Sequence, residues 1–264
     1  MGFWIFSILI IILSVAFFFG FIYLIFKMFF KAFAKPLTLV SDAIKKASEA
    51  QARRLKDLEA WATSKQLQFD PAQDYAIAQQ LSDLECLNRG EDRYVYNRTF
   101  GEWQRFSYLG SDYHFVTYSE TSSTDSIGRE SRQTNHHQFS AVVLASKMPL
   151  RPLFLRPEGI LDQIPQLLGF EDIDFESPEF SRSFYVKAPD KRWAYDVFHP
   201  LMMEFLLKSP RFTIEFGRDH LIAYKTTTGT TIFSVEEFQA AAEVLAGILE
   251  RLPNYLMRQQ GSLS

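Results

Sequence analysis

The segment RFTIEFGRDHLIAYKTTTGTTIFSVEEFQAAAEVLAGILERL, residues 211–252, decides the fold class. It begins with two short apolar runs, 211–216 and 220–224, on either side of Gly217-Arg218-Asp219. Short apolar runs joined by a glycine-containing turn predict a β-hairpin. A polar turn then leads to a last short strand at 231–233.

A helix is expected directly after this strand. Ser234 and Glu237 form a capping box, in which each side chain accepts a hydrogen bond from the backbone N–H of the other residue. One wide apolar face indicates a helix packed on a core. That face comprises Phe238, Ala241, Ala242, Leu245, Ile248, Leu249 and Leu252, and the helix ends at Pro253. A hairpin beside a long amphipathic helix is typical of an α+β domain.

Shorter elements precede the hairpin. The expected elements are a helix at 159–168, a strand at 173–176, a helical turn at 177–180 and a strand at 184–187. Asp190 is a suitable N-cap for a further helix. Pro200 then restarts that helix, because proline fits the first helical turn.

The middle of the chain is strand-rich. Alternating aromatic and polar residues indicate half-buried antiparallel strands, which we place at 93–96, 104–109, 113–119 and 138–145. Gly110-Ser111-Asp112 is expected to form a turn. Residues 119–137 are Ser, Thr, Asn, Gln and charged residues with almost no apolar members, which predicts a long exposed hairpin loop. Loops of this length in a compact domain are either functional or flexible.

Residues 36–66 predict a helix, since apolar residues recur there at spacings of three and four. Arg53, Arg54 and Lys56 are expected on a solvated face. The thin apolar stripe leaves two alternatives open. The helix is either a stalk that docks its Leu55–Trp61 end on the domain, or a short coiled-coil seam that forms a homodimer at the membrane. A shorter helix is predicted at 72–87.

The N-terminal segment predicts a membrane anchor. Residues 1–26 carry no charged side chain, and the apolar run 3–26 exceeds the ~20 residues that a helix needs to cross a bilayer. It is too long for a signal peptide, and no Lys or Arg precedes it. We therefore expect one uncleaved transmembrane helix that contacts the lipid bilayer through residues 3–26.

The orientation of this anchor follows from basic residues on its C-terminal side, namely Lys27, Lys31, Lys35, Lys45 and Lys46. The N-terminal side offers only the α-amino group. The positive-inside rule then places the N-terminus outside and the C-terminal domain in the cytoplasm, at the inner (plasma) membrane.

The composition favours a packed domain and argues against nucleic-acid binding. The chain is 47% hydrophobic and 16% aromatic, which argues for a packed domain. Beyond residue 35 it holds 25 basic and 31 acidic residues, a net charge of −6. An acidic domain lacks the basic surface that nucleic-acid binding requires. The single cysteine, Cys86, excludes an intramolecular disulfide and is expected to be a buried structural thiol.

The sequence contains no recognisable motif for catalysis, nucleotide binding or metal binding. The sequence has no glycine-rich phosphate loop and no Gly-x-Ser-x-Gly elbow. The only histidine pair, His136-His137, would point to opposite faces of an extended segment, so no metal site is expected. We therefore assign no catalytic residue and expect no cofactor. Two alternatives stay open, a hydrolase using Asp112, His114 and a loop serine, and a cavity for a small apolar ligand among the aromatics.

Three stretches carry a family resemblance: NRTFG at 97–101 followed by FSY at 106–108, DIDFESPEFSRSFYV at 172–186, and the region from Asp190 to HPLMME at 199–204. They resemble an uncharacterised family of bacterial single-pass membrane-anchored proteins, over about Trp61–Tyr255. The resemblance implies a bacterial origin and this domain order. It implies no residue-level function.

Together these features predict an α+β fold of antiparallel strands packed with helices. The expected order is an anchor at 1–35, a stalk helix at 36–66, a soluble domain at 67–258 and a tail at 259–264. The soluble domain is either one piece or two halves, about 67–148 and 159–258. The expected function is that of a membrane-tethered cytoplasmic domain, not an enzyme, that binds a protein partner through 119–137 or assembles at the membrane.

Overall fold

The computed structural model describes residues 2–124, 130–159, 171–253 and 255. Within these ranges, no side chain is described for 2–16, 29–41, 120–124, 130–131 and 171–172. The chain divides into two units, residues 1–53 and 54–264, which are described in turn.

The first unit is helical and belongs to helix α1 (Gly2–Ser64), which runs without interruption through the boundary between the expected anchor and the expected stalk. Every described side chain from 17 to 28 is exposed. Phe17 is 78% exposed and Phe26 is 66% exposed. A search of the described residues finds no helix with both the length and the apolar character that crossing a membrane requires.

The second unit begins with the last turns of α1. These turns are amphipathic: Leu58, Trp61 and Ala62 are buried, while Glu59 and Ala60 between them are exposed. The Trp61 ring lies 6.0 Å from Trp103 and 6.4 Å from Phe238, measured between centroids. The expected docking of this end of the helix on the domain is therefore confirmed.

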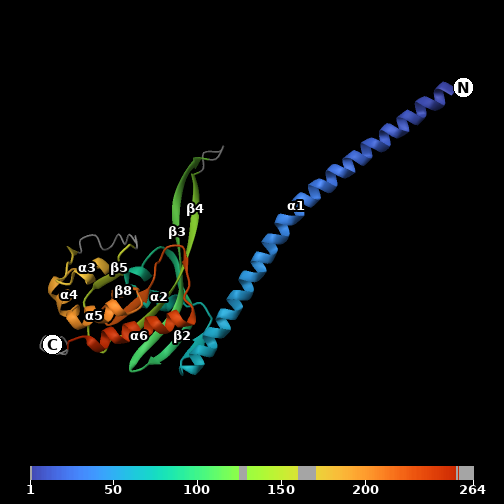
Figure 1. The fold of residues 1–264 in the computed structure, drawn as a ribbon. Coiled ribbons are helices and arrows are strands. Elements are labelled where there is room, and N and C mark those ends of the chain that lie inside the picture. The colour runs from blue at the N-terminus through green and yellow to red at the C-terminus, as the bar shows by residue number, and fades with distance from the viewer. Residues whose placement is uncertain (1, 125–129, 160–170, 254, 256–264) are drawn as a thin grey trace. The chain divides into compact units, whose positions relative to one another are not determined.

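Ten strands of the described residues form one sheet (Figure 1). They are β1 (Gln68–Asp70), β2 (Glu91–Trp103), β3 (Phe106–Thr124), β4 (Glu130–Ala145), β5 (Leu153–Pro157), β6 (Glu171–Asp172), β7 (Phe184–Ala188), β8 (Thr213–Phe216), β9 (His220–Tyr224) and β10 (Thr230–Thr231). The order is β1-β2-β3-β4-β9-β8-β5-β7-β6, all antiparallel, and β10 adds a short parallel pairing to β4. Both predicted halves of the soluble domain contribute to this sheet.

One sequence prediction fails in β3 and β4, and a second holds only in part. The expected turn at Gly110-Ser111-Asp112 is continuous strand, paired with Val142, Ala141 and Ser140. The strand can continue because the Asp112 carboxylate is neutralised inside the domain, as described below. The hairpin expected at 119–137 is present, but most of it is paired strand and not loop, since β3 continues to Thr124 and β4 starts at Glu130. Polarity there reflects strands that leave the sheet and project as a hairpin (Figure 1).

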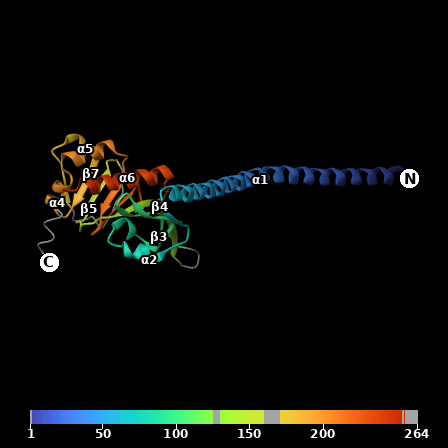
Figure 2. The ribbon, with the colours of Figure 1, turned by 90° about the horizontal axis from the view of Figure 1, so that it is seen from below.

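The helices occupy opposite faces of the sheet (Figure 2). Helices α6 (Val235–Arg251) and α5 (Pro200–Lys208), together with the end of α1, cover one face over a large core that includes Tyr108, Leu144 and Phe238. Helix α2 (Tyr75–Gln80) and the 3-10 turn η1 (Glu85–Leu87) cover the other face, over Tyr113, Phe139 and Tyr224. Alternate residues of β3, β4 and β9 thus contribute to two separate cores.

Most of the C-terminal predictions are confirmed. The hairpin forms as β8 and β9, and the Ser234–Glu237 capping box opens α6. Asp190 caps α4 (Lys191–Val197), and α5 begins at Pro200. Ser177 caps α3 (Pro178–Ser183), whereas 173–176 is not a strand. The predicted 72–87 helix is split into α2 and η1, and the predicted 159–168 helix lies almost wholly outside the described residues.

Candidate functional site

A buried ion pair connects α1 to the sheet. Arg54 donates from both terminal nitrogens to the two carboxylate oxygens of Asp112, each at 2.8 Å. The Asp112 side chain is 1% exposed and the Arg54 side chain 19% exposed. A two-pronged contact of this kind matches the planar guanidinium to the carboxylate and fixes orientation as well as charge. The expectation that Arg54 lies on a solvated face was wrong.

Two neutral side chains also donate hydrogen bonds to the Asp112 carboxylate. Asn97 Nδ2 donates at 2.8 Å and Ser140 Oγ donates at 2.5 Å to its carboxylate. Asn97 adopts a positive φ of 50° at a bulge of β2, which directs its amide at Asp112. Ser140 Oγ also accepts from the Phe233 N–H, and Arg54 Nε donates to the Phe233 carbonyl. The connection from β10 to α6 is thus included in the same network.

This arrangement bears on the hydrolase alternative. Asp112 and His114 lie on the same face of β3, but each is engaged elsewhere. His114 Nδ1 lies 3.3 Å from the Asp92 carbonyl and its Nε2 lies 3.2 Å from His136 Nδ1. Among the described residues, no hydrogen bond joins Asp112 to His114. A carboxylate held by Arg54 in a packed network is a structural connection and not an orienting group for a catalytic base.

A second buried carboxyl lies under the opposite face. Glu215 accepts from the Tyr224 hydroxyl at 2.5 Å and from the Cys86 backbone N–H at 3.2 Å. Burial raises the pKa of Glu215 above its ordinary value, against these hydrogen bonds, which lower it. Burial also raises the pKa of the Cys86 thiol. Cys86 is therefore the buried structural thiol that the sequence predicted.

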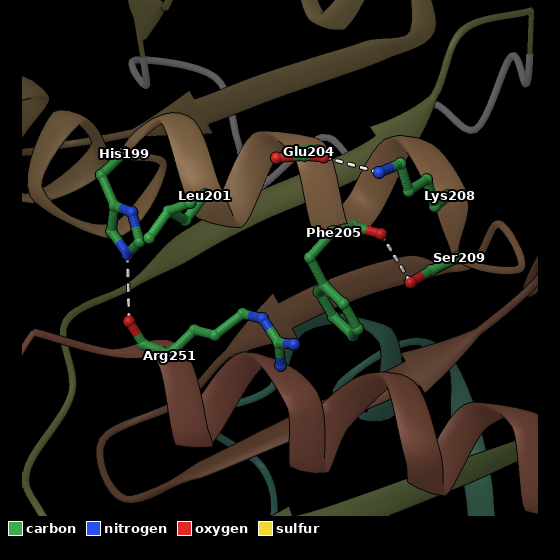
Figure 3. Close-up of a pocket in the computed structure, with 7 residues that line it drawn as sticks. All are labelled: His199, Leu201, Glu204, Phe205, Lys208, Ser209 and Arg251. Carbon is green, nitrogen blue, oxygen red and sulfur yellow. Dashed lines mark hydrogen bonds and ion pairs between the residues drawn. The ribbon is translucent and has the colours of Figure 1, made fainter.

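An open groove lies between α5 and the end of α6 (Figure 3). Its volume is about 600 Å³, and it is lined by His199, Leu201, Glu204, Phe205, Lys208, Ser209 and Arg251. The Arg251 guanidinium lies 4.1 Å from the centre of the Phe205 ring and donates to the Gly247 carbonyl at 2.9 Å. A Cβ at Gly247 would lie 2.3 Å from the tip of the Phe205 ring, so any larger residue would force that ring to move.

The chemistry of this groove is mixed. Leu201, which is 68% exposed, and Phe205 supply apolar surface, while Arg251 and Lys208 supply positive charge beside Glu204. His199 Nε2 contacts the Arg251 carbonyl at 3.0 Å across the groove, instead of capping its own helix. The groove can receive an apolar group that carries a negative or hydrogen-bonding head. Among the described residues that line it, no nucleophile is hydrogen-bonded to a base.

A smaller polar cleft of about 330 Å³ lies beside the β8–β9 turn. Its His220 is placed between two carboxylates, with Nδ1 2.6 Å from Asp219 and Nε2 3.1 Å from Asp83. Asp83 also accepts from the Arg218 backbone N–H. These contacts tie the α2–η1 segment to the turn. Within the residues that the structure describes, no group of three or more His, Cys, Asp and Glu side chains could hold a metal ion.

One exposed part of the sheet is the hairpin arm, which we define as 117–124 of β3 and 130–137 of β4. Its strands pair with each other from Thr117↔Asn135 to Thr124↔Glu130. Strand β2 stops pairing with β3 at Val116, and β10 and β9 pair with β4 only from Gln138 onward. In the described part of the chain, both outer edges of the arm therefore carry unpaired backbone groups, which are available to another strand.

Comparison with known proteins gives one informative structure. No family model matches the chain, and no curated protein matches it in sequence. The crystal structure of the mycobacterial trehalose monomycolate transport factor A, TtfA, matches with a TM-score of 0.51 and 11% identity. The match covers 75% of this chain and 96% of TtfA. At this identity the likeness shows that the two proteins share a fold.

Proposed function

We propose that this chain is a membrane-tethered docking domain. Residues 3–26 lie in the bilayer, the basic residues that follow lie on the cytoplasmic side, and the sheet domain binds a protein partner or assembles at the inner membrane. The domain does no chemistry of its own. The proposal depends above all on one observation, the uncovered apolar surface of α1.

That surface is extensive. Residues 17–28 include nine large apolar or aromatic side chains with exposed fractions between 42% and 78%, besides Tyr23, and the sequence from 1 to 26 has no charge. Exposing apolar area to water costs about 25 cal/mol per Å². Contiguous apolar patches beyond a few hundred Å² mark contact with a membrane or another protein. A helix that is apolar on all sides matches a lipid environment.

The same helix is part of the folded domain. Leu58 and Trp61 enter its core, and Arg54 neutralises its buried Asp112. The C-terminal end of the helix that carries the proposed tether therefore belongs to the folded domain. Removal of the whole helix would leave Asp112 buried without its cation, so the 54–64 end of α1 must stay with the domain.

The docking surface that we favour is the arm. Its two unpaired strand edges offer backbone donors and acceptors to an extended peptide, which is the mode of recognition known as strand addition. This keeps the role proposed for 119–137 but changes its physical basis, from a flexible loop to a pre-formed hairpin. Pre-formed strands lose less conformational entropy on binding than a loop does.

Membrane attachment is tested with Phe18→Lys combined with Ile22→Lys. Each charge near the centre of a transmembrane helix costs about 2.5–3.5 kcal/mol of insertion free energy. We expect the wild type to stay in the membrane pellet after alkaline washing and the double variant to move to the supernatant. Ile44→Lys is the matched control, since Ile44 is 65% exposed on the same helix but outside the apolar run. A double variant that stays membrane-bound would refute the anchor.

Orientation is tested separately with a reporter fused after Ser264. A fluorescent protein that matures only in the cytoplasm should be active there, and an alkaline phosphatase that requires export should be inactive. The opposite pattern would place the domain outside the cytoplasm.

Partner binding is then tested by replacing 118–135 with a short turn and measuring recovery of cross-linked partners.

A second candidate is a lipid-related accessory role, favoured by the fold shared with a transport factor and by the groove between α5 and α6. The groove is lined by apolar Leu201 and Phe205 together with basic Lys208 and Arg251. The full chain in detergent should then bind a fluorescent fatty acid, and Leu201→Asp should weaken that binding. Equal binding by the variant would remove the groove from consideration.

A further inference from the structure

Two histidines meet at the root of the arm. His114 on β3 and His136 on β4 are diagonal neighbours, because His136 pairs directly with Val116. His114 Nε2 lies 3.2 Å from His136 Nδ1, and the ring centroids are 5.4 Å apart. The pair lies beyond the Asp112 network on the same face of the sheet, at the point where β2 stops pairing with β3.

The second contact of His114 defines which of its nitrogens is free for a ligand. Its Nδ1 lies 3.3 Å from the Asp92 carbonyl oxygen, which can only accept, so Nδ1 carries the proton. In the neutral ring, Nε2 then presents its lone pair toward His136. One nitrogen oriented by a backbone carbonyl and the other free is the usual arrangement of a metal-binding histidine. The Tyr94 ring stacks on His114 at 4.6 Å and holds its plane.

The spacing fits a shared ion. Two nitrogens that each lie about 2.0–2.1 Å from a tetrahedral zinc ion are separated by about 3.3 Å. The observed separation of 3.2 Å therefore requires only a small adjustment. His114 is 6% exposed and His136 is exposed, so a metal ion can reach the pair from solvent.

We propose that His114 Nε2 and His136 Nδ1 chelate a divalent transition-metal ion of the Zn²⁺ or Ni²⁺ type, with water in the remaining positions. Imidazole nitrogens suit these ions. The ion would join β3 to β4 across the strands, where the arm leaves the sheet. This goes beyond the docking function and does not depend on it. Adjacent His136 and His137 do point to opposite faces, but His136 reaches a histidine 22 residues away.

Zinc titration of the full chain in detergent micelles tests the proposal. Competition with a chromophoric chelator would give the affinity for Zn²⁺ alone. We expect His136→Ala and His114→Gln each to weaken binding at least about tenfold, because each removes one of two protein ligands. His137→Ala is the matched control on the adjacent position of the same strand, and its affinity should stay within about twofold of wild type.

A second readout separates metal binding from misfolding. Zn²⁺ should raise the thermal unfolding midpoint of the wild type and of His137→Ala but not that of His136→Ala, whose fold is checked by circular dichroism without metal. The proposal is overturned if His136→Ala binds Zn²⁺ as tightly as wild type, or if the wild type neither binds nor is stabilised. In either case the two histidines would form an ordinary hydrogen-bonded pair.

Discussion

Two regions of helix α1, 17–28 and 54–62, have the same backbone structure but differ in which side chains are buried. Between 17 and 28 every described side chain is exposed and nearly all are apolar. Between 54 and 62, by contrast, the buried residues Leu58, Trp61 and Ala62 share the helix with exposed polar ones, and Arg54 enters a buried ion pair. Helical hydrogen bonds are satisfied within the helix at both ends. The side chains alone determine what each end must contact.

This contrast explains how one element can serve two environments. An apolar helix surface without protein contacts indicates lipid or a partner, whereas a one-sided apolar stripe indicates a protein core. The buried charge adds specificity at the second end, because Asp112 accepts Arg54 in only one register of the helix on the sheet. Substitutions in 17–28 and in 54–62 should therefore have very different effects on the stability of the domain.

The largest expected effect is that of Asp112→Ala. It leaves Arg54 without its anion and also removes the acceptor of Asn97 and Ser140. Breaking a buried ion pair from one side costs about 3–5 kcal/mol, and the Asn97 and Ser140 donors left without an acceptor add to this loss. Urea unfolding of the full chain in detergent measures the loss. Asp57→Ala, on an exposed position of the same helix, should change stability by less than about 0.5 kcal/mol.

A smaller loss is expected for Leu58→Ala, which truncates a fully buried side chain of α1. Leucine-to-alanine changes in cores cost about 2–5 kcal/mol, through lost burial and the cavity left behind. Ile44→Ala removes a similar volume from an exposed position of the same helix and should cost less than about 0.5 kcal/mol. Equal losses for the two variants would contradict the assignment of only one end to the domain core.

Ser140→Ala should cost less again. Its hydroxyl donates to Asp112 and accepts from the Phe233 N–H, and the residue is fully buried. An unsatisfied buried group costs about 1–3 kcal/mol, here the Phe233 N–H. Ser48→Ala, whose exposed hydroxyl contacts only a local carbonyl in the same helix, is the control and should be neutral. A neutral Ser140→Ala would mean that water replaces the hydroxyl.

Much of the fold could be predicted because local signals agreed with tertiary demands. The C-terminal hairpin and α6 carry a turn, a capping box and one apolar face, all of which point to the same structure. The turn at 110–112 could not be predicted correctly, because Gly-Ser-Asp normally indicates a turn. Only the distant Arg54 makes Asp112 compatible with a buried strand. Likewise, the polar composition of 119–137 indicates an exposed hairpin loop but does not show that most of the segment is paired strand.

The candidate sites were harder to predict for the same reason. Arg54 lies between Arg53 and Lys56, and nothing local separates the buried cation from its exposed neighbours. His114 and His136 meet only because β3 and β4 pair in one register. The groove between α5 and α6 depends on Gly247, whose signal in the sequence is an isolated glycine inside a strong helix. Such a glycine often has a packing reason, and this was the one clue available.

The smallest effect concerns pH and compares the two buried carboxyls. Asp112 is paired with Arg54, whereas the described residues give Glu215 no ion pair but hydrogen bonds from the Tyr224 hydroxyl, the Cys86 N–H and the Cys86 thiol. Because burial raises the pKa of Glu215 in the folded state, folding favours its protonated form. Its stabilising contribution is then complete below the unfolded pKa and is lost as pH rises through the folded pKa.

Glu215→Gln removes this titration. The free energy of unfolding of the wild type relative to Glu215→Gln should therefore fall as the pH is raised from about 5 to about 8. Urea unfolding at several pH values measures the difference, in which all other titrating groups cancel. Glu204→Gln is the control: hydrogen bonding and attraction to Lys208 lower the pKa of Glu204, so its difference should be flat over this range. If the free energy of unfolding of the wild type relative to Glu215→Gln instead rose with pH, Glu215 would be ionised in the folded state and stabilised by a cation, as Asp112 is by Arg54.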